Sequence, residues 1–375
     1  MEKVHKFIEC ALPVTVCNLE CSYCYVIQRH NRSMQMPKLK YSPELIGKGL
    51  SKARWGGTCY FSICGAGETL IPKESVEIAA EILKQGHFVN ITTNGTLSKR
   101  FDELVALPEE HRQRIHIAFS FHYLELVRTK LLNTFFDNVD KVRDAGCSFL
   151  VQINLCDEYI EQLEEIKRLC LARTGALPQV AATRKENNLT SDIEFLTNLP
   201  LEKYLSLGRE VDSPLFEFTM RNFNVRQGGF CYAGDWTGQL DLGTGMLSRC
   251  YGSVIRQDIF RDTKKPIDFC AVGRHCGSLF CMNSSHFLSL GAIPDAYQDV
   301  TYAGLRNRRH AGWYSSRMDE FLSSKLIETN RPYAASKRIQ VQLYALYEFT
   351  YKHLAAVKRS LRKRGRDEHA ETAQR

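Results

Sequence analysis

The chain has 375 residues, 44% of them hydrophobic and 25% charged, with a formal net charge of +8 at pH 7. These values are ordinary for a globular enzyme of one large domain or two domains. No apolar stretch approaches the roughly 20 residues that a membrane span needs, and the start at Met1 has no signal-peptide pattern. The tail Lys358–Arg366 carries six Lys and Arg residues and so accounts for most of the net charge of +8, which means that the body of the chain does not indicate a nucleic-acid partner. We therefore expect a cytoplasmic protein that binds neither membranes nor nucleic acids.

Short apolar runs alternate with amphipathic segments from residue 6 to about residue 210. Apolar strands that alternate with helices are typical of a parallel sheet covered by helices. The predicted strands are Lys6–Val16, Thr58–Cys64, His87–Thr93, Ile115–Phe121, Cys147–Leu155 and Gln179–Ala182. The predicted helices are Leu45–Trp55, behind a Ser42-Pro43 start, Pro72–Gln85, Leu124–Ala145 and Glu158–Ala172. Six such units are fewer than the eight of a full barrel.

The pattern changes after Ser213, where glycine and cysteine become frequent. We predict a strand over Pro214–Arg226, a hairpin over Gln239–Leu247 and a long helix over residues 336–362. The aromatic residues of that helix predict packing against the body of the protein rather than a substrate site. They are Tyr344, Tyr347 and Tyr351.

The 14 cysteines are unevenly distributed, which in a cytoplasmic chain indicates metal binding rather than a disulfide framework. Cys17, Cys21 and Cys24 form a C-x3-C-x2-C group, with Tyr23 directly before the third cysteine. Three thiolates supply three of the four ligands of a 4Fe–4S cluster and leave one iron open. Zinc needs a fourth protein ligand, which this loop lacks nearby. Zinc and a chance grouping stay as the alternatives to an iron–sulfur cluster.

This loop, at the end of a first strand, resembles the cluster-binding motif of the radical S-adenosylmethionine (radical SAM) superfamily. The resemblance implies a partial barrel of six units with its functional residues at the carboxyl ends of the strands. It implies that Cys17, Cys21 and Cys24 hold the cluster, and that the amino and carboxylate groups of SAM bind the open iron. An electron from a reductase such as flavodoxin or ferredoxin would cleave SAM to methionine and a 5′-deoxyadenosyl radical. That radical would abstract hydrogen from a substrate C–H bond.

Further residues that resemble motifs of this superfamily stand at the ends of the next predicted strands. Gly65-Ala66-Gly67-Glu68 is similar to a Gly-Gly-Glu motif whose backbone and carboxylate contact the SAM amino group, with alanine replacing the second glycine. Asn94-Gly95 by itself predicts a turn, and in the superfamily this stretch borders the active site. The residues implied to contact SAM are Tyr23, Gly65, Ala66, Gly67, Glu68, Thr93, Asn94, Ser120 and Asn154.

Polar residues near the ends of the fourth and fifth predicted strands are candidates for contact with the substrate. His122 follows the fourth strand. Gln152 and Asn154 alternate with apolar residues on the fifth, so their side chains should point into the barrel, where they need partners. We take His122 and Asn154 as the catalytic candidates, with Gln152 as a further position.

The second cysteine group begins with Cys231, Gly245 and Cys250, whose spacing resembles the opening of the SPASM and twitch modules of radical SAM enzymes. Those modules carry auxiliary 4Fe–4S clusters. Five cysteines cannot fill two clusters of four ligands each, so the resemblance implies one auxiliary cluster. Its ligands would be Cys231, Cys250, Cys276 and Cys281, with Cys270 in reserve. A zinc ribbon is the alternative for this module.

We therefore predict an α/β fold in three parts. A partial (β/α)6 TIM-like barrel spans residues 1–212, a small α+β cluster-binding module spans residues 213–335, and a helix with a basic tail spans residues 336–375. We expect a radical SAM enzyme that modifies a peptide or protein side chain. Because the first strand begins near residue 6, a leader-binding domain is not expected, so an oxidase or epimerase of carbohydrates or other small molecules is the alternative. A non-catalytic iron–sulfur protein is the second alternative, against which the retained motif Gly65–Glu68 argues.

Overall fold

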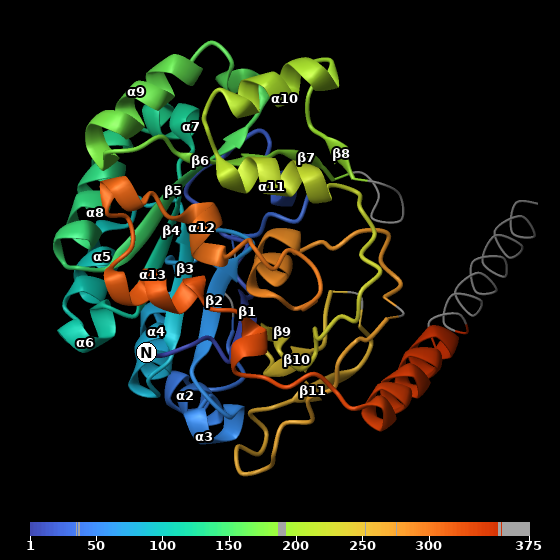
Figure 1. Cartoon of the computed structure of the whole chain (residues 1–375). Helices are drawn as coiled ribbons and strands as arrows, with labels where there is room; N and C mark the ends of the chain where they lie inside the picture. The colour runs from blue at the N-terminus through green and yellow to red at the C-terminus, as the bar shows by residue number, and fades with distance from the viewer. Residues whose placement is uncertain are drawn as a thin grey trace, which may run out of the picture.

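A parallel sheet of six strands forms the centre of the computed structural model, which describes residues 1–34, 36, 38–186, 193–251, 253–274, 276–351 and 354. The strands pair in chain order (Figure 1). Their bounds are β1 Lys6–Leu12, β2 Cys59–Gly65, β3 Phe88–Thr93, β4 Ile115–Ser120, β5 Ser148–Leu155 and β6 Gln179–Ala182. Nearly all of their apolar side chains are buried, as expected for a sheet covered on both faces. The predicted α/β fold is confirmed.

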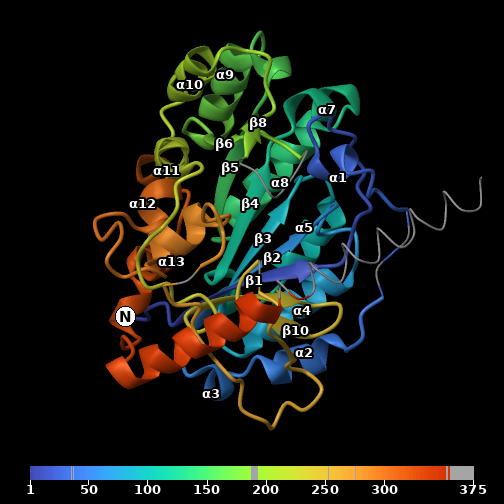
Figure 2. The same cartoon turned by 90° about the vertical axis from the view of Figure 1, so that its right-hand side faces the viewer.

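The helices between these strands mostly cover the outer face of the sheet, as the two perpendicular views show (Figures 1 and 2). Each of the longer helices buries one apolar face, for example Ile78 and Ile82 in α4 and Phe135 and Val139 in α8. The bounds are α1 Tyr25–Gln28, α2 Pro43–Gly49, α3 Lys52–Trp55, α4 Glu74–Lys84, α5 Ser98–Val105, α6 Glu109–Arg112, α7 Tyr123–Arg128, α8 Leu132–Asp144, the short 3-10 helix η1 Asp157–Tyr159 and α9 Leu163–Thr174.

Two segments predicted as single helices are interrupted. The predicted Leu45–Trp55 divides into α2 and α3, and the side chains of Arg54 and Trp55 donate hydrogen bonds to the carbonyl of Gly49, where α2 ends. The predicted Leu124–Ala145 divides into α7 and α8 because Lys130, between them, adopts a left-handed backbone conformation with a φ of 59°. Both breaks are stabilised by local hydrogen bonds at helix ends, which periodicity alone does not reveal.

The strand predicted over Pro214–Arg226 is wrong, because this segment forms helix α11, Pro214–Asn222. Ser213 caps the helix by accepting a hydrogen bond from the backbone N–H of Phe216, and Pro214 occupies the first turn. The same Ser-Pro start opens α2. Before α11 lie the short antiparallel pair β7 Arg184–Lys185 and β8 Glu194–Phe195, and helix α10 Leu201–Arg209.

The predicted hairpin over Gln239–Leu247 is confirmed, and it extends the central sheet. Strands β9 Thr237–Asp241 and β10 Met246–Ser248 pair antiparallel, and β11 Arg256–Asp258 follows at the edge. β9 pairs in parallel with β1, so the nine strands have the order β11-β10-β9-β1-β2-β3-β4-β5-β6. Gly245 has a φ of 78°, and a Cβ there would lie 2.8 Å from Asp258 Oδ1, so the turn requires glycine.

The rest of the C-terminal part packs against the other face of the sheet (Figure 2). It contains the π-helical turn η2 Ser284–Leu288, helices α12 Tyr302–Arg306 and α13 Ser316–Ser323, and the 3-10 turns η3 Arg309–Ala311 and η4 Leu326–Glu328. Phe321 of α13 stacks on Phe88 of β3 with ring centroids 3.8 Å apart, and Tyr302 of α12 contacts Tyr60 of β2. None of the helices in the described residues has the length and apolar character that a membrane crossing requires.

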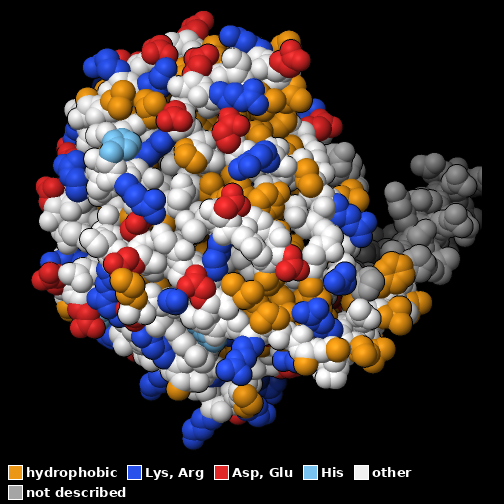
Figure 3. Space-filling view, viewed as in Figure 1, with side chains coloured by type: hydrophobic (Ala, Val, Ile, Leu, Met, Phe, Trp, Pro, Cys, Tyr) orange, Lys and Arg blue, Asp and Glu red, His pale blue; other side chains and the backbone are white. Residues whose placement is uncertain are grey.

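Residues 335–351 form the predicted C-terminal helix, but the predicted packing of its tyrosines is wrong. Tyr344, Tyr347 and Tyr351 are 41%, 61% and 53% exposed, and hydrophobic side chains gather on this helix at the right of the molecule (Figure 3). The helix is attached instead through the buried Val341 and through Glu348, whose carboxylate accepts from the N–H of Val254 at 2.7 Å. The end of the predicted helix and the basic tail Lys358–Arg366 lie outside the described residues.

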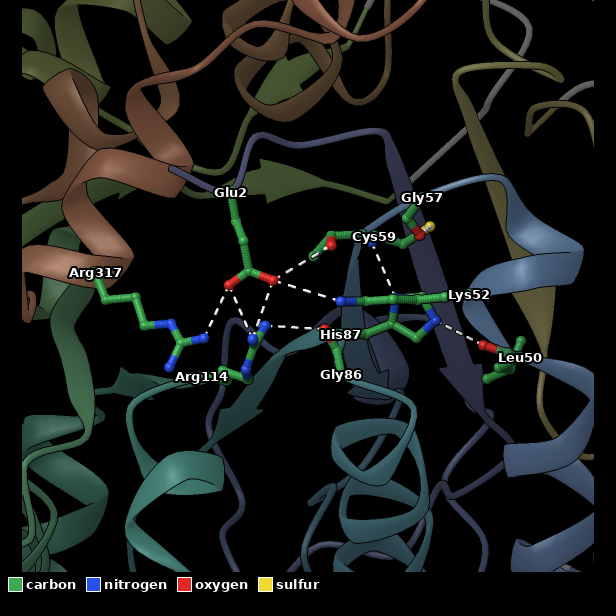
Figure 4. A network of polar contacts seen from close by, with 10 residues as sticks. Glu2, Leu50, Lys52, Gly57, Cys59, Gly86, His87, Arg114 and Arg317 are labelled. Carbon is green, nitrogen blue, oxygen red and sulfur yellow. Dashed lines mark hydrogen bonds and ion pairs between the residues drawn. The ribbon is translucent and has the colours of Figure 1, made fainter.

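A network of charged and polar side chains lies at the amino ends of the strands (Figure 4). The Glu2 carboxylate accepts hydrogen bonds from Arg317 at 2.9 Å and Arg114 at 3.0 Å and lies 3.4 Å from Lys52 Nζ. Partial burial raises the pKa of Glu2, but the hydrogen bonds from Arg317 and Arg114 outweigh this and lower it to about 2. Nearby His87 accepts from the N–H of Cys59 at Nδ1, so Nε2 donates to the carbonyl of Leu50 at 2.6 Å.

Candidate active site

A cavity of about 250 Å³ lies at the carboxyl ends of the parallel strands, opposite the Glu2 network. The carboxyl ends of parallel strands meet at one edge of a sheet, so loops that are far apart in the sequence converge there. The cavity lining includes every residue that the sequence analysis linked to the first cluster or SAM, together with His122. These residues are Cys17, Cys21, Tyr23, Cys24, Gly65, Ala66, Gly67, Glu68, Thr93, Asn94, Ser120, His122 and Asn154. Gln152 instead lines a neighbouring cavity.

The loop with the three cysteines packs against the segment that follows β2, and backbone hydrogen bonds join the two just before the loop. The N–H of Gly67 donates to the carbonyl of Val14 at 2.7 Å, and the N–H of Glu68 donates to the carbonyl of Val16 at 2.8 Å. A Cβ on Gly67 would lie 2.1 Å from the oxygen of Val16, and one on Gly65 would lie 2.3 Å from Val14 Cγ1. The missing side chains of Gly65 and Gly67 thus allow the cysteine loop to approach closely, while both glycines also line the cavity.

The Glu68 carboxylate joins the end of β2 to the end of β3. Its Oε1 accepts from the N–H of Leu70 at 2.8 Å and from Thr93 Oγ1 at 2.7 Å, and its Oε2 accepts from the N–H of Asn94 at 2.7 Å. Burial raises the pKa of Glu68 above its usual value, although these hydrogen bonds act to lower it. Since a carboxylate accepts about four hydrogen bonds, one acceptor position is left on Oε2.

Asn94 connects β3 to the cysteine loop. Its Nδ2 donates to Asn18 Oδ1 at 2.8 Å and lies 3.8 Å from Cys17 Sγ, while its Oδ1 accepts from the Thr96 hydroxyl at 2.7 Å. The predicted turn is also present, since Gly95 has a φ of 75°. Asn94 therefore forms part of the turn and also lines the cavity.

Tyr23 is held at its hydroxyl by two side chains from distant parts of the chain. Its oxygen lies 2.7 Å from His122 Nδ1 and 2.9 Å from the hydroxyl of Tyr159. Burial lowers the pKa of His122 to about 4, so the imidazole is neutral at pH 7. His122, a catalytic candidate from the sequence, thus positions the cysteine loop through Tyr23. Tyr159 had no motif or strand-end position to reveal it.

Arg32 is a further contact that sequence reasoning missed. Its guanidinium donates to the carbonyl of Cys17 and to the carboxylate of Glu20, both at 2.9 Å, and it lines the cavity. Arg184 and Glu186, beyond β6, complete the rim. No spacing pattern marks these residues, because they reach the cavity only through the tertiary fold.

Residues 12–170 match the family model of the Radical SAM superfamily. The matched residues make up less than half of the chain and include the cysteine loop and Gly65–Glu68. Domains of this superfamily hold a 4Fe–4S cluster and SAM, so the match makes these two the candidate cofactors of this part of the chain. The three thiols of Cys17, Cys21 and Cys24 that line one cavity fit the donor set that such a cluster requires.

A curated relative with sequence similarity is the 7-carboxy-7-deazaguanine synthase of Methanospirillum hungatei, 38% identical over 89 residues. That match covers 24% of this chain, and the chain spans only about a third (33%) of the relative's length.

Solved structures with a similar fold include Streptococcus suis SuiB bound to S-adenosylmethionine, at 15% identity and a TM-score of 0.47, covering 69% of this chain and 64% of that one. Another is anSMEcpe with bound AdoMet and the Cp18Cys peptide, at 15% identity and a TM-score of 0.45, covering 95% and 99% of the two chains.

Beyond the residues matched by the family model, four cysteines of the second group line one small cavity of about 40 Å³. They are Cys231, Cys250, Cys276 and Cys281. Burial, followed by the neighbouring thiols, raises the pKa of Cys231, and burial raises that of Cys281 to about 12. Cys270 lines a different cavity, and its thiol lies 3.7 Å from the carbonyl of Ala271. The structure thus brings together the four residues chosen as ligands and separates the reserve cysteine from them.

Four cysteine thiols suit either an iron–sulfur cluster or zinc, and binding of either would release their protons. In the described part of the chain, no group of three or more His, Cys, Asp or Glu side chains is arranged to hold a metal ion as it stands. The assignment of an auxiliary cluster therefore stays a prediction of the sequence.

Proposed function

We propose that this protein is a radical SAM enzyme that abstracts hydrogen from a peptide or protein side chain. The observation that carries the proposal is the single cavity that contains three cysteines of the C-x3-C-x2-C loop together with Gly65–Glu68, Asn94 and Ser120. A chance grouping of cysteines would not be expected to meet these residues from four separate segments of the chain.

In this proposal the side chains hold and orient the cofactors. Cys17, Cys21 and Cys24 bind the cluster, while Arg32 and Asn94 fix the loop around Cys17. The spare acceptor of Glu68 and the backbone near Ala66 would bind the SAM amino group. A 4Fe–4S cluster held by these cysteines would supply the electron for reductive cleavage of SAM, and SAM bound beside it would supply the radical chemistry that removes hydrogen from a C–H bond.

The second cysteine group supports a module of the SPASM or twitch type with one auxiliary 4Fe–4S cluster. The shared cavity of Cys231, Cys250, Cys276 and Cys281 favours these four as ligands. A reductase such as flavodoxin or ferredoxin is the proposed electron donor. The cytoplasmic location expected from the sequence stays a prediction.

The peptide substrate is favoured by the Cys231–Gly245–Cys250 spacing, which resembles modules found most often on peptide-modifying enzymes. An oxidase or epimerase acting on a carbohydrate or another small molecule is the second candidate. It is favoured by a neighbouring cavity of about 240 Å³, which has the size of a small-molecule site.

The test is anaerobic reconstitution followed by iron analysis and a turnover assay. We expect about eight irons in the native protein, from two 4Fe–4S clusters, and slow formation of 5′-deoxyadenosine with dithionite and SAM. Cys24→Ala should reduce 5′-deoxyadenosine to background. The matched control is Cys170→Ala, which changes a buried cysteine of α9 outside both cysteine groups. This variant should still form 5′-deoxyadenosine.

Replacing Cys17, Cys21 and Cys24 together by alanine should leave one cluster in the Mössbauer spectrum. A colourless triple variant, or zinc in the native protein, would contradict the auxiliary cluster. A native protein with a full complement of iron that forms no 5′-deoxyadenosine would contradict the enzyme proposal. Transfer of deuterium from a labelled sugar but from no peptide would favour the second candidate.

A further inference from the structure

A second cavity, of about 240 Å³, lies between the two cysteine groups; we call it the middle chamber. It shares Thr92 and Ser120 with the candidate active site and Phe280 and Cys281 with the cavity of the second cysteine group. Strands β3 to β6 form one side of the chamber, and α11, η2 and α12 form the other. A substrate in this position would lie beside the candidate SAM site.

The charges in the middle chamber are all positive. Arg184 and Arg306 are among its described lining residues, and no aspartate or glutamate is. Arg184 is exposed at the rim, whereas Arg306 is only 2% exposed. The chamber therefore combines a buried cation with an apolar and neutral polar surface.

Arg306 lacks a counter-ion within the described chain. Its Nη2 donates to the carbonyl of Ser285 at 3.1 Å, and its guanidinium lies 3.8 Å from the centre of the Tyr302 ring. Its Nη1 is buried and has no hydrogen-bond partner, and no described carboxylate forms an ion pair with it. An unpaired buried charge is costly, so the natural complement is an anion that binds in the chamber.

The groups packed around Arg306 are neutral at pH 7. Burial, followed by the charge of Arg306, lowers the pKa of His116 to about 3 and that of His286 well below its usual value. Burial raises the pKa of Tyr60 and Tyr314. None of these side chains neutralises the guanidinium, so its charge is available to a ligand.

A second unpaired group lines the chamber on β3. Asn90 Oδ1 is buried and has no partner, while its Nδ2 donates to Ser62 Oγ at 2.9 Å. The chamber thus offers one unpaired donor on Arg306 and one unpaired acceptor on Asn90. A substrate that satisfies both needs an anionic oxygen and an N–H or O–H group.

We propose that the middle chamber is the substrate site and that Arg306 binds a carboxylate group of the substrate. One buried guanidinium balances one negative charge, and a carboxylate matches the planar donors of arginine. The proposal rests on the proposed function, because it names the substrate class of the same enzyme. The carboxylate can belong to an acidic side chain of a peptide or to a small molecule.

The experiment measures binding of 4-fluorobenzoate by ¹⁹F NMR to the anaerobically reconstituted protein with saturating SAM and no reductant. The probe is compared with 4-fluorobenzamide, which has a similar shape and no charge. We expect the benzoate to bind at least about tenfold more tightly, since the amide lacks the negative charge and the second acceptor oxygen that a carboxylate offers to the guanidinium. Equal affinities in the native protein would overturn the proposal without need of any variant.

Variants locate the binding. Arg306→Gln should abolish the preference for benzoate, whereas Arg306→Lys should retain part of it because the charge is kept. The matched control is Arg309→Gln, an exposed arginine paired with Asp319 outside the chamber, which should keep the preference in full. A preference that persists in a folded Arg306→Gln protein, or one that is lost in Arg309→Gln, would overturn the assignment.

The two sources of the carboxylate are separated by competition. Displacement of 4-fluorobenzoate by a blocked peptide with one glutamate, and not by its glutamine counterpart, supports a peptide carboxylate. Displacement by free small carboxylates alone supports a small-molecule substrate. Failure of the proposed function is distinguishable: a protein that shows carboxylate preference but never forms 5′-deoxyadenosine overturns the enzyme proposal alone. A protein that forms 5′-deoxyadenosine but shows no preference for the carboxylate overturns only the role of Arg306.

Discussion

The two ends of the parallel sheet are built differently. At the amino ends, Glu2 is surrounded by Arg114, Arg317 and Lys52, and both ring nitrogens of His87 have partners (Figure 4). At the carboxyl ends, the loops enclose a cavity lined by three thiols and by a buried carboxylate with an acceptor position to spare. At the amino ends most polar groups pair with one another and stabilise the fold, with Arg114 Nε as a buried exception, whereas the acceptor position left on the Glu68 carboxylate faces a cavity.

The contrast predicts that small changes at the carboxyl ends affect cofactor binding, while changes at the amino ends affect stability alone. Three substitutions test this, from the largest expected effect to the smallest.

Gly67→Ala should have the largest effect. Its new methyl group would lie 2.1 Å from the backbone oxygen of Val16, so the cysteine loop must move. We expect a stability loss of about 1–3 kcal/mol, as for overpacking, and loss of the cluster, measured by iron content and 5′-deoxyadenosine formation. The matched control is the adjacent Ala66→Gly, which adds no atoms and should keep the cluster. Full iron content in Gly67→Ala would contradict the close approach of the two loops.

Glu68→Gln should have an intermediate effect. The amide places an N–H₂ group where Leu70, Thr93 or Asn94 now donates, so at least one hydrogen bond is lost. We expect SAM binding to weaken by about 1–3 kcal/mol, measured by calorimetry on the reconstituted protein. Glu81→Gln is the control, because this carboxylate of α4 is paired with Lys84 and lies outside the cavity. Unchanged SAM affinity in Glu68→Gln would remove this carboxylate from the cofactor site.

Glu2→Gln should have the smallest effect and should not alter 5′-deoxyadenosine formation. The Glu2 pKa is about 2 in the folded protein against an ordinary value of 4.5. Because the folded pKa is the lower one, the carboxylate stabilises the fold above about pH 4.5, and this stabilisation falls as the pH decreases toward 2. Since Glu2 is partly exposed, we expect Glu2→Gln to lower the free energy of unfolding by about 1 kcal/mol at pH 7.

The measurement for Glu2→Gln is urea unfolding of both proteins between pH 3 and pH 7. The difference in unfolding free energy should be constant near neutral pH and narrow below about pH 4.5. A difference that grows in acid would show that the arginines do not act through the ionised carboxylate.

Much of the central fold could be predicted because its signals are local. Each of the six strands is a short apolar run, and β6 has the predicted bounds Gln179–Ala182. The order of the strands follows from the strand–helix alternation, which brings the ends of successive strands to one edge. The grouping of the cysteine loop with Gly65–Glu68 and Asn94 could be expected for the same reason.

Two predictions failed, for different reasons. The strand predicted over Pro214–Arg226 missed a local signal, because Ser213 and Pro214 carry a helix start. The tyrosines of the C-terminal helix were predicted to be buried, but Val341 and Glu348 make the attachment instead. A helical stripe of aromatic residues identifies a face, but it does not tell whether another element covers that face.

The sequence alone determined the six parallel strands, the positions of the thiols and the glycine-rich turn, because each depends on neighbours within a few residues. Only the tertiary structure decided that β9 joins the sheet beside β1, that Cys270 lies apart from the other four cysteines, and that Arg306 is buried without a counter-ion. The first feature joins segments more than 100 residues apart, the second depends on how the loops that carry the five cysteines fold, and the third depends on what fails to pair inside the core. Spacing along the chain carries no information about such contacts, since the packing of the whole domain sets them.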